Sequence, residues 1–333
     1  MSTLVGGHML ASALTGAQVL GHALAGAQVL GPALASGHSI GAALAPVIEP
    51  GFFSSVAVHV AVAIGAAVAI VSGAVGMFTV MRGQSFAGEA LGDIGTTGGS
   101  AAFLGGIGLL WGIVAIDIVA AAVMELIGIQ RPRGRDLATG IVLGAFLGLA
   151  ALLLYLNTTF HPATGAVNAI LFGSVFTVAR SQIPAITALS VAALAIVVLL
   201  YRPLLLSSMS AEIAAARGIP VRFVGAAYLL AMALAVALAS MTIGTILSTA
   251  LLVGPAATAL RLTRRPGVAI AVAAMLGVGA MWLGILLAYD SYYWPPKGNG
   301  WPVSFFVVTL IFLAYLLSGL PARLRARPRA RTA

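Results

Sequence analysis

Cysteine and charge are the two things this sequence most lacks. None of its 333 residues is cysteine, and only 8% are charged. Without cysteine there are no disulfides, thiolate metal sites or cysteine nucleophiles, so any metal chemistry must use oxygen or imidazole ligands. In contrast, 61% of the residues are hydrophobic, and they form repeated runs long enough to cross a bilayer. These features predict an integral membrane protein.

The length of the apolar runs predicts the fold class. Lipid offers no partner to exposed backbone groups, so the spans must be helices or a closed barrel, and runs of about 20 apolar residues indicate helices. We therefore expect an all-α, polytopic membrane helix bundle with eight or nine transmembrane helices. The predicted spans lie near residues 56–80, 86–108, 109–129, 137–157, 182–202, 221–242, 244–262, 268–289 and 302–320.

Two details of this plan concern the middle of the chain. Residues 158–181 are too polar and broken for a span, so we expect a short surface or re-entrant helix around "AVNAILFGSVFTV", and the span count depends on that choice. Gly140, Gly144 and Gly148 form a small-xxx-small pattern, which predicts a close approach of neighbouring helices.

Basic residues give the chain a formal net charge of +9, but they are not spread like a nucleic-acid-binding surface. They gather in short clusters between spans, and all clusters fall on one predicted side, which the positive-inside rule makes cytoplasmic. Arg180 and Lys297 are exceptions. We expect a multi-pass protein of the plasma membrane, in contact with lipid and not with nucleic acid. The clusters are Arg82; Arg131, Arg133 and Arg135; Arg202, Arg217 and Arg222; Arg261, Arg264 and Arg265; and the C-terminal tail.

Composition divides the chain into three parts. Residues 1–50 repeat Ala-Leu and Gly every ten residues, a period typical of a low-complexity extension, and we interpret His8, His22 and His38 there as incidental. Residues 51–322 form the predicted transmembrane domain. Residues 323–333 form a basic cytoplasmic tail.

The informative residues are the few acids, because an ionisable side chain within a span costs roughly 2.5 to 3.5 kcal/mol on insertion scales. Glu89 and Asp93 lie four residues apart, which places both on one helix face where their oxygens can bind a common cation. Pairing with Arg82 near the cytoplasmic end is the alternative, and it suits one acid better than both. We favour the cation pair.

Other polar residues within the spans are weaker candidates. Asp117 lies in mid-span and faces either the same pathway or a hydrogen-bonding neighbour helix, while Glu125 is better explained as a structural partner of the following basic loop. His59, in the first span, is a secondary candidate metal ligand. Hydroxyl side chains at the junction of two predicted spans either line a pathway or bond between helices: Ser240, Thr242, Thr245, Ser248 and Thr249.

A short helix is predicted on the positive side, within "LSSMSAEIAAARGIPV". Ser210 is a natural N-cap, Glu212 falls in the first turn, and Gly218 and Pro220 end the helix. Such an element is either a docking helix or an ordinary loop.

Four fragments in this order resemble the zinc/manganese family of ABC transporter permeases: "RGQSFAGEALGDIGTTG", "NAILFGSVFTV", "SAEIAAARGIPVRFV" and "IGTILSTALLVGPAATALRL". The resemblance covers roughly residues 52–320. It implies a type II importer-like permease that dimerises with itself or a second permease, binds a cytoplasmic ABC ATPase, and receives a divalent metal ion from an extracytoplasmic metal-binding protein. It implies no cofactor of the chain itself.

The resemblance also assigns residues. Glu212, Ala215, Gly218 and Pro220 match the family's coupling helix, at the ATPase interface. Family members usually carry Asp-Ala-Leu-Ser-His in the second span, where this chain has Glu89-Ala90-Leu91-Gly92-Asp93. Replacement of the imidazole by a carboxylate shifts the preference from Zn²⁺ toward Mn²⁺ or another oxygen-preferring ion. The predicted metal residues are thus Glu89, Asp93, Asp117 and His59.

The sequence also bears on two other function classes. The sequence contains no G-x-x-x-x-G-K-[ST] motif, so a permease would need a separate ATPase, and the chain itself is not expected to be an enzyme. A stand-alone, ion-coupled secondary transporter is the alternative, with Glu89, Asp93 and Asp117 as a relay, although the spans show no inverted repeat. An intramembrane enzyme lacks a recognisable catalytic constellation.

Overall fold

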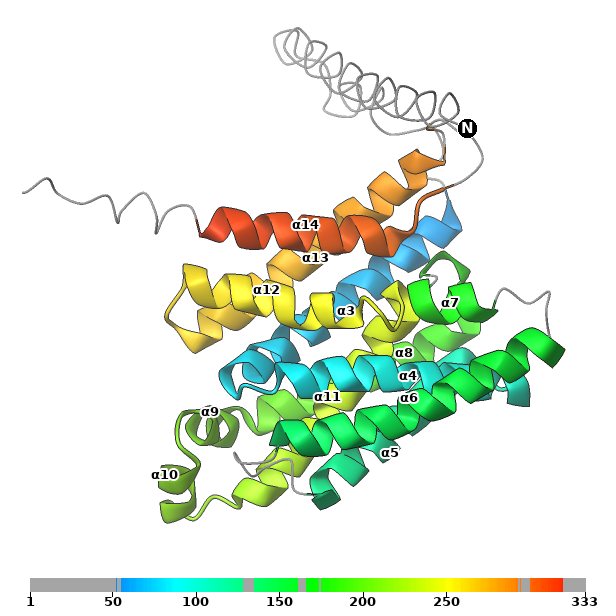
Figure 1. Ribbon diagram of the computed structural model, residues 1–333. Helices are drawn as coiled ribbons and strands as arrows, with labels where there is room; N and C mark the ends of the chain where they lie inside the picture. The colour runs from blue at the N-terminus through cyan, green and yellow to red at the C-terminus, as the bar shows by residue number, and fades with distance from the viewer. Residues whose placement is uncertain are drawn as a thin grey trace, which may run out of the picture. The chain divides into compact units, whose positions relative to one another are not determined.

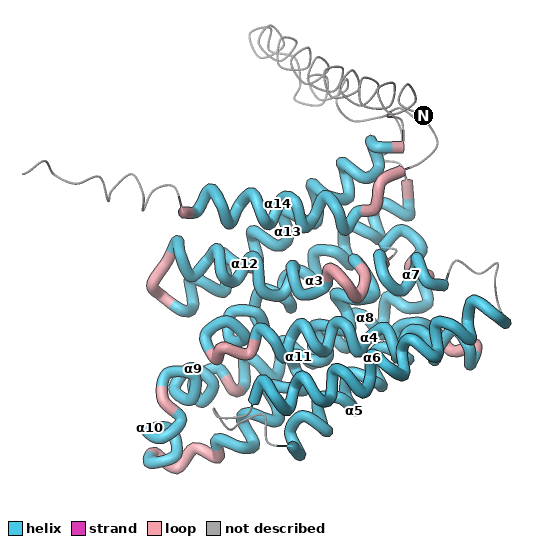
Figure 2. Tube along the Cα trace, viewed as in Figure 1, coloured by secondary structure: helices cyan, strands magenta, loops and turns pink. Residues whose placement is uncertain are grey.

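A computed structural model describes residue 52 and residues 55–127, 135–160, 166–173, 175–292, 294 and 300–319. Within these ranges the regular structure is helical, with no strand, as predicted (Figure 2). The chain divides into two units, Met1–Ser55 and Val56–Ala333, and nearly all described residues belong to the second. The predictions for the 1–50 extension with its histidines and for the 323–333 tail lie outside the described residues.

Each of the nine predicted spans has its helix in the described part of the chain. Six of these helices are both long and apolar enough to cross a membrane: α3, α5, α6, α8 with the turn before it, α11 and α13. α12 and α14 are shorter, and glycines, hydroxyls and two acids lower the hydropathy of α4. The nine helices are α3 (Val56–Met81), α4 (Ser85–Gly105), α5 (Leu109–Ile127), α6 (Arg135–Phe160), α8 (Ile183–Leu199), α11 (Val221–Ile243), α12 (Ser248–Leu262), α13 (Pro266–Ser291) and α14 (Val303–Ser318).

Short helices fill the connections where the sequence predicts them. The segment after α6 contains α7 (Ala166–Phe172) and a 3-10 turn, η2 (Val175–Thr177), which confirms the predicted short helix in place of a span. Ile170 of α7 and Val175 of η2 are buried, so this segment packs into the bundle. A second turn, η3 (Arg180–Gln182), precedes α8, and α9 (Tyr201–Met209) and α10 (Ala211–Ala216) lie between α8 and α11.

Successive long helices run in alternating directions, which brings the basic connections to one end of the bundle. Figure 1 shows the α3–α4 turn, α9, α10 and the α12–α13 turn together at the left of the view. Arg82, Arg202, Arg217, Arg261 and Arg264 lie in or beside these connections. We call this the basic end, and it agrees with the predicted one-sided distribution of charge.

The closest contacts between helices occur at glycines, but not at the three glycines for which the sequence pattern predicts a close contact. A side chain at Gly98 of α4 would collide with the backbone of Gly112 in α5, and one at Gly76 of α3 would collide with the backbone of Leu252 in α12. Gly140, Gly144 and Gly148 have open space beside them. The prediction of a close contact at these three glycines is therefore wrong for the single chain, because they lie on the outward face of α6.

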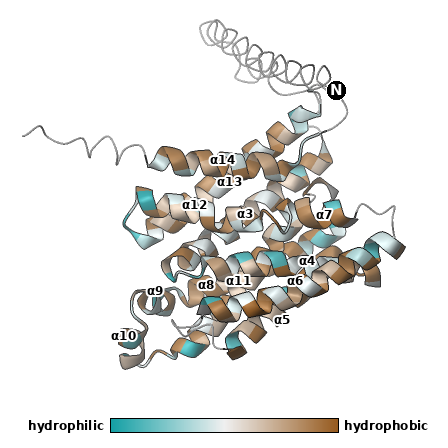
Figure 3. Cartoon of the chain, viewed as in Figure 1, coloured by the Kyte–Doolittle hydropathy of each residue, from teal (hydrophilic) through white to brown (hydrophobic). Residues whose placement is uncertain are grey.

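α4 and α6 differ in hydropathy, and they also differ in how far the bundle encloses them. Figure 3 shows α6 as largely brown, while α4 beside it carries white and teal segments. α4 packs against α5, α6, α11 and α12. A polar helix is thus enclosed by apolar ones, and this enclosed helix carries the two acids.

Candidate functional site

Glu89 and Asp93 lie on the one side of α4 that the bundle leaves open. Glu89 is exposed and Asp93 half-buried, whereas every other residue from Ala90 to Ser100 is buried. Their spacing puts both carboxylates on one face, one helical turn apart, as the sequence predicts. Phe86, which is 39% exposed, continues the same face toward the basic end. The two acids therefore form an outward-facing carboxylate stripe.

The side of α4 next to the carboxylate stripe packs against the junction between α11 and α12. A side chain at Gly92 would meet the hydroxyl groups of Ser248 and Thr249 and the backbone of Thr245. One turn further along α4, Thr96 Oγ1 donates a hydrogen bond of 3.0 Å to Thr245 Oγ1. Glycine thus lets α4 approach the hydroxyl-rich junction closely, and Thr96 connects the two.

The junction is a break between helices held by a third segment. α11 ends at Ile243, Gly244 adopts a φ of +91°, and α12 begins at Ser248. Thr245 N donates a hydrogen bond of 3.1 Å to Ile170 O in α7. Gly244 and Gly173 also touch backbone to backbone, where no Cβ fits. The predicted span over 244–262 consequently starts four residues late, and its first residues form a fixed turn that positions Thr245.

The hydroxyl groups of this region have different kinds of hydrogen-bond partner. Thr242 Oγ1 donates to Leu238 O and Ala239 O within its own helix, and Ser248 Oγ donates to Thr245 O. Thr245 Oγ1 instead accepts a hydrogen bond from Thr96 Oγ1 of α4, another long helix. Of the two interpretations left open for these residues, bonding between helices explains Thr245. Thr242 and Ser248 fit neither interpretation directly, because their hydroxyl groups bond to nearby backbone carbonyls.

Asp117 is enclosed in the bundle without a hydrogen-bond partner. It is 0% exposed, and among the described residues neither carboxylate oxygen has a hydrogen-bond partner. A Cβ placed on Gly95 would lie 3.6 Å from Asp117 Oδ1 and 3.5 Å from Thr245 Cγ2. Asp117 thus lies beside α4 and the α11–α12 junction, and the structure does not realise the alternative of a hydrogen bond to a neighbouring helix.

The structure does not gather all the sequence-predicted metal residues into one cluster. His59 is exposed in the first turn of α3, at the end opposite the basic end, and Glu125 is half-buried near the end of α5. Within the described ranges, no group of three or more His, Asp or Glu side chains could hold a metal ion. Among the described residues, Glu89 and Asp93 therefore form a pair of carboxylates without a third His, Asp or Glu side chain grouped with them.

The predicted short helix is present at the basic end as α10. Ser210 accepts a hydrogen bond of 3.3 Å from Ile213 N as N-cap of α10. Gly218 has a φ of +79°, and Ile219 N donates to Ala214 O at 3.1 Å, which closes the C-terminus in the manner of a glycine cap. The capping residues thus act as the sequence indicates.

The surface of α10 is open to a partner. Glu212, Ala215, Gly218 and Pro220 are all exposed. Ile213 is 53% exposed and Met209, just before the helix, 76% exposed, so apolar side chains accompany the acid.

Arg82, in the turn before α4, contacts α9 and α11. The sequence did not predict these contacts. Arg82 Nη1 donates a hydrogen bond of 3.0 Å to Ser207 Oγ in α9, and its guanidinium lies 5.2 Å from the ring centroid of Tyr228. Tyr228 in turn hydrogen-bonds to Thr79 Oγ1 at 2.6 Å and Val75 O at 3.1 Å. The turn that leads into α4 is thereby bound to α9 and α11.

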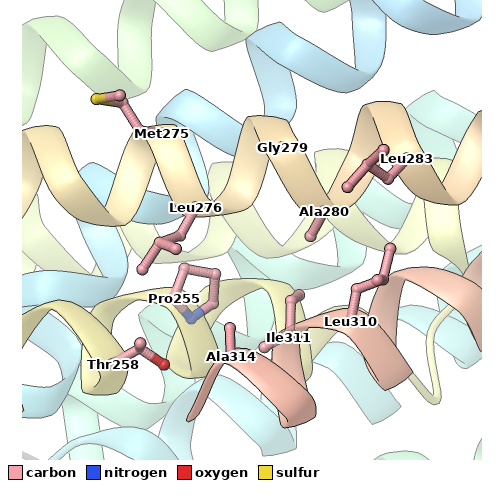
Figure 4. A pocket seen from close by; sticks show the side chains of 10 residues that line it. All are labelled: Pro255, Thr258, Met275, Leu276, Gly279, Ala280, Leu283, Leu310, Ile311 and Ala314. Carbon is pink, nitrogen blue, oxygen red and sulfur yellow. The ribbon is translucent and has the colours of Figure 1, made fainter. Parts of the chain in front are cut away.

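A groove of about 220 Å³ lies elsewhere, between α12, α13 and α14 (Figure 4). Its walls are apolar, with Pro255, Leu276 and Ile311 among them. The hydroxyl of Thr258 donates to Gly254 O in its own helix at 2.8 Å. None of the lining residues is charged, so this groove does not suit a metal ion.

Comparison with known proteins tests the family resemblance. Residues 55–318 match the ABC 3 transport family. The chain belongs to this family. Within it, the chain is 31% identical over 254 residues to the manganese transport system membrane protein MntC of Halalkalibacterium halodurans, covering 75% of this chain and 84% of that one. It is 30% identical over 228 residues to the manganese import system permease protein ScaB of Streptococcus parasanguinis, covering 67% and 79%.

A solved structure of similar fold agrees. PsaBC from Streptococcus pneumoniae, determined in complex with a Fab, aligns with a TM-score of 0.69 at 25% identity, covering 81% of this chain and 93% of that one. The resemblance to metal ABC transporter permeases is therefore confirmed, together with the multi-pass location in the membrane. The ABC 3 match ends at residue 318, the last residue of α14.

Proposed function

We propose that this ABC 3 family chain is the membrane-spanning subunit of an importer for a divalent metal ion, driven by a separate ATPase subunit. The observation that carries the proposal is the outward-facing carboxylate stripe of Glu89 and Asp93 on an otherwise enclosed helix. The relatives named for manganese transport support the same class of cargo. The chain itself is a transport subunit, and ATP hydrolysis belongs to the partner.

The ligand chemistry of the stripe favours manganese over zinc. Carboxylate oxygens are hard ligands that suit Mn²⁺, whereas Zn²⁺ gains more from imidazole or thiolate. Two carboxylates supply few of the ligands that a tightly bound ion needs. A weak site suits transport, because an ion that binds too tightly cannot leave. His59, at the far end of α3, stays a candidate ligand for the ion's passage at that end.

The position of the stripe also supports a permease dimer. A charged side chain that faces lipid costs roughly 2.5 to 3.5 kcal/mol, so Glu89 needs water or protein beside it and not acyl chains. A second permease subunit, identical or different, would cover this face and enclose a pathway between the two. An extracytoplasmic metal-binding protein would deliver the ion at the end opposite the basic end.

The route from ATP to the pathway would begin at α10. Its exposed residues Glu212, Ala215, Gly218 and Pro220 would contact the ATPase, with Ile213 as an apolar anchor. Motion of α9 and α10 would then reach the start of α4 through the Arg82–Ser207 hydrogen bond. Alternating access follows if the ATPase favours one of two arrangements of these packed helices.

The carboxylate role is tested by Glu89→Gln with Asp93→Asn, measured as ⁵⁴Mn uptake in cells that lack their own importer. Removal of both charges should abolish uptake. Because the shapes of the two side chains hardly change, the amount of protein in the membrane should stay the same. Asp136→Asn, an exposed acid in the first turn of α6, is the matched control and should transport normally. Uptake of the double variant at the wild-type rate would remove the stripe from the pathway.

The docking role is tested by co-purification with the ATPase. Glu212→Arg reverses the exposed charge, and Gly218→Trp forces a bulky residue into a φ of +79°, so both should lose the ATPase. Asp136→Arg should retain it. Manganese transport by the purified chain without any ATPase would instead support an ion-coupled secondary transporter.

A further inference from the structure

The apolar groove between α12, α13 and α14 has no part in the proposed transport function (Figure 4). Its volume is about 220 Å³, and none of its lining residues is charged. Two of them, Met275 and Leu283, are 74% and 53% exposed, so the groove opens toward the outside of the bundle. Lipid covers that surface in a membrane protein. The groove therefore lies where an acyl chain can enter it.

Glycines decide where the three helices touch and where they leave room. α14 contacts α12 at Gly254, where a side chain would collide with Ile311. It contacts α13 at Gly284, where a side chain would collide with Val307. Gly279 instead lies on the groove wall, and a Cβ there would have no heavy atom within 4 Å. The close contacts therefore hold the walls in place, while Gly279 leaves room between them.

An arginine is held beside the groove, on the side of the basic end. Arg261 follows the lining residue Thr258 by three positions in α12, about 4.5 Å further along the helix axis. Its guanidinium lies 3.6 Å from the ring centroid of Tyr315 in α14, and it donates hydrogen bonds to the hydroxyl and the carbonyl oxygen of this tyrosine. Ala314, the residue before Tyr315, also lines the groove. Arg261 thus connects α12 and α14 at the groove's end.

Two further arginines make this end strongly positive. Arg264 and Arg265 lie in the turn between α12 and α13, and both are exposed. The sequence from 248 to 318 contains a single acid, Asp290, at the opposite end of α13. The three arginines therefore reach the membrane surface without a carboxylate from their own helices nearby. Arginine presents five N–H donors in a planar fork that fits a phosphate group, so this end complements an anionic lipid headgroup.

The groove and the arginines contribute to lipid binding in different ways. Acyl chains are as apolar as the groove walls, so moving a chain from the bilayer into the groove brings no hydrophobic gain. The groove can position a lipid but does not select one. Selection comes from the headgroup, because basic residues at the cytoplasmic side of a span attract anionic lipids. Because the arginines adjoin the groove, one lipid molecule can use both.

We propose that the groove and Arg261, Arg264 and Arg265 together bind one anionic phospholipid of the cytoplasmic leaflet. Its phosphate contacts the arginines, and one of its acyl chains lies in the groove. A lipid held there contacts α12, α13 and α14, so its binding stabilises the packing of these helices. The site does not depend on which ion is transported, and it therefore goes beyond the proposed function.

The headgroup part is tested by native mass spectrometry of the purified full-length chain, with phosphatidylglycerol and phosphatidylcholine titrated separately. Phosphatidylglycerol should bind more tightly. Each arginine changed to glutamine should lower its affinity about fivefold, and Arg261→Gln, Arg264→Gln and Arg265→Gln together should lower it on the order of a hundredfold. The affinity for phosphatidylcholine should stay the same.

A matched control removes the same charge from other connections at the basic end. Arg202→Gln, Arg217→Gln and Arg222→Gln together change three exposed arginines of α9, α11 and the turn after α10. This triple variant should bind phosphatidylglycerol like the wild type. All variants keep the C-terminal tail, so its arginines contribute equally to each measurement.

Gly279→Leu tests the groove separately from the arginines. The new side chain has room beside the helix and occupies the space that the acyl chain needs, so the complex with phosphatidylglycerol should be lost although all three arginines remain. Gly144→Leu is the matched control, because it adds the same side chain at a glycine of α6 that also has open space beside it. It should bind lipid like the wild type.

Three results would overturn the lipid site. Equal affinity for the two lipids, or an unchanged affinity after loss of Arg261, Arg264 and Arg265, would show that headgroup charge at this end does not matter. Unchanged binding by Gly279→Leu would show that the lipid does not use the groove. A dimer that becomes a monomer on Gly279→Leu, seen in the same spectra, would assign the groove to a second copy of the chain. Gly279→Leu keeps the test decisive should the triple arginine variant fail to fold.

Discussion

α4 and α6 pack against each other and have similar lengths of 21 and 26 residues, but their sequences and surroundings are opposite. α4 contains two acids, glycines and hydroxyls, and from Ala90 to Ser100 only Asp93 escapes burial. α6 is apolar, yet among its described side chains only Ala138, Thr139, Val142, Ala150 and Asn157 are buried. In a bilayer the polar helix belongs inside, because lipid is a good solvent for leucine and a poor one for a carboxylate.

The comparison explains where glycine matters. Gly98 of α4 faces the backbone of Gly112, whereas Gly144 of α6 faces open space. Both glycines lie in helices and both belong to small-residue patterns. Only the first allows two helices to touch, so the same residue type is a packing requirement in one helix and free of contacts in the other.

The largest effect is expected from a charge placed on the lipid-facing side of α6. Leu152 is 54% exposed, and Leu152→Asp should disfavour membrane insertion by roughly 3 to 4 kcal/mol, the difference between the two residues at a helix centre. A glycosylation-based insertion assay measures this. Normal insertion would show that protein or water, and not lipid, covers this side of α6.

A slightly smaller effect is expected from enlarging the glycine at the α4–α5 crossing. Gly98→Leu must push apart two backbones, which should lower the free energy of unfolding by about 3 kcal/mol and the thermal midpoint in detergent accordingly. Gly144→Leu is the matched control and should change stability little. A strong loss on Gly144→Leu would instead identify α6 as a face covered by a second subunit.

The smallest effect is expected from the hydrogen bonds that join the two helices. Asn157 Nδ2 of α6 donates to Ser100 O at 2.9 Å, and Thr97 Oγ1 of α4 donates to Phe146 O at 2.8 Å. Asn157→Leu and Thr97→Val should each cost about 1 kcal/mol of stability. Additive losses in the double variant would mean that the two bonds act independently, and a double-mutant cycle by chemical denaturation in micelles would reveal any coupling.

Much of the fold was accessible to sequence reasoning because its signals are local. Runs of apolar residues predict all nine long helices, and Ser210 with Gly218 predicts both ends of α10, since a cap depends on residues only a few positions apart. The interruption around residues 158–181 is likewise visible as a change in composition. Spacing alone places Glu89 and Asp93 on one face.

The contacts that complete the candidate site were not accessible in this way. Thr96 lies three residues after Asp93, which is a usable signal for the shared face, but nothing local indicates its bond to Thr245, 149 residues away. The link from Arg82 to Ser207 spans 125 residues and was missed for the same reason. The choice between Gly98 and Gly144 also depends on which helix is enclosed.

The sequence by itself determined that the chain is a bundle of membrane helices, which end is basic, where the capped helix lies, and which acids share a face. Each of these follows from hydropathy, charge or helical period, which act over one helix or less. Only the tertiary structure decided that α4 is enclosed while α6 faces outward, and that Asp117 lies beside Gly95 and Thr245. Those facts depend on how distant helices pack, because burial and contact are properties of the whole bundle and not of any one segment.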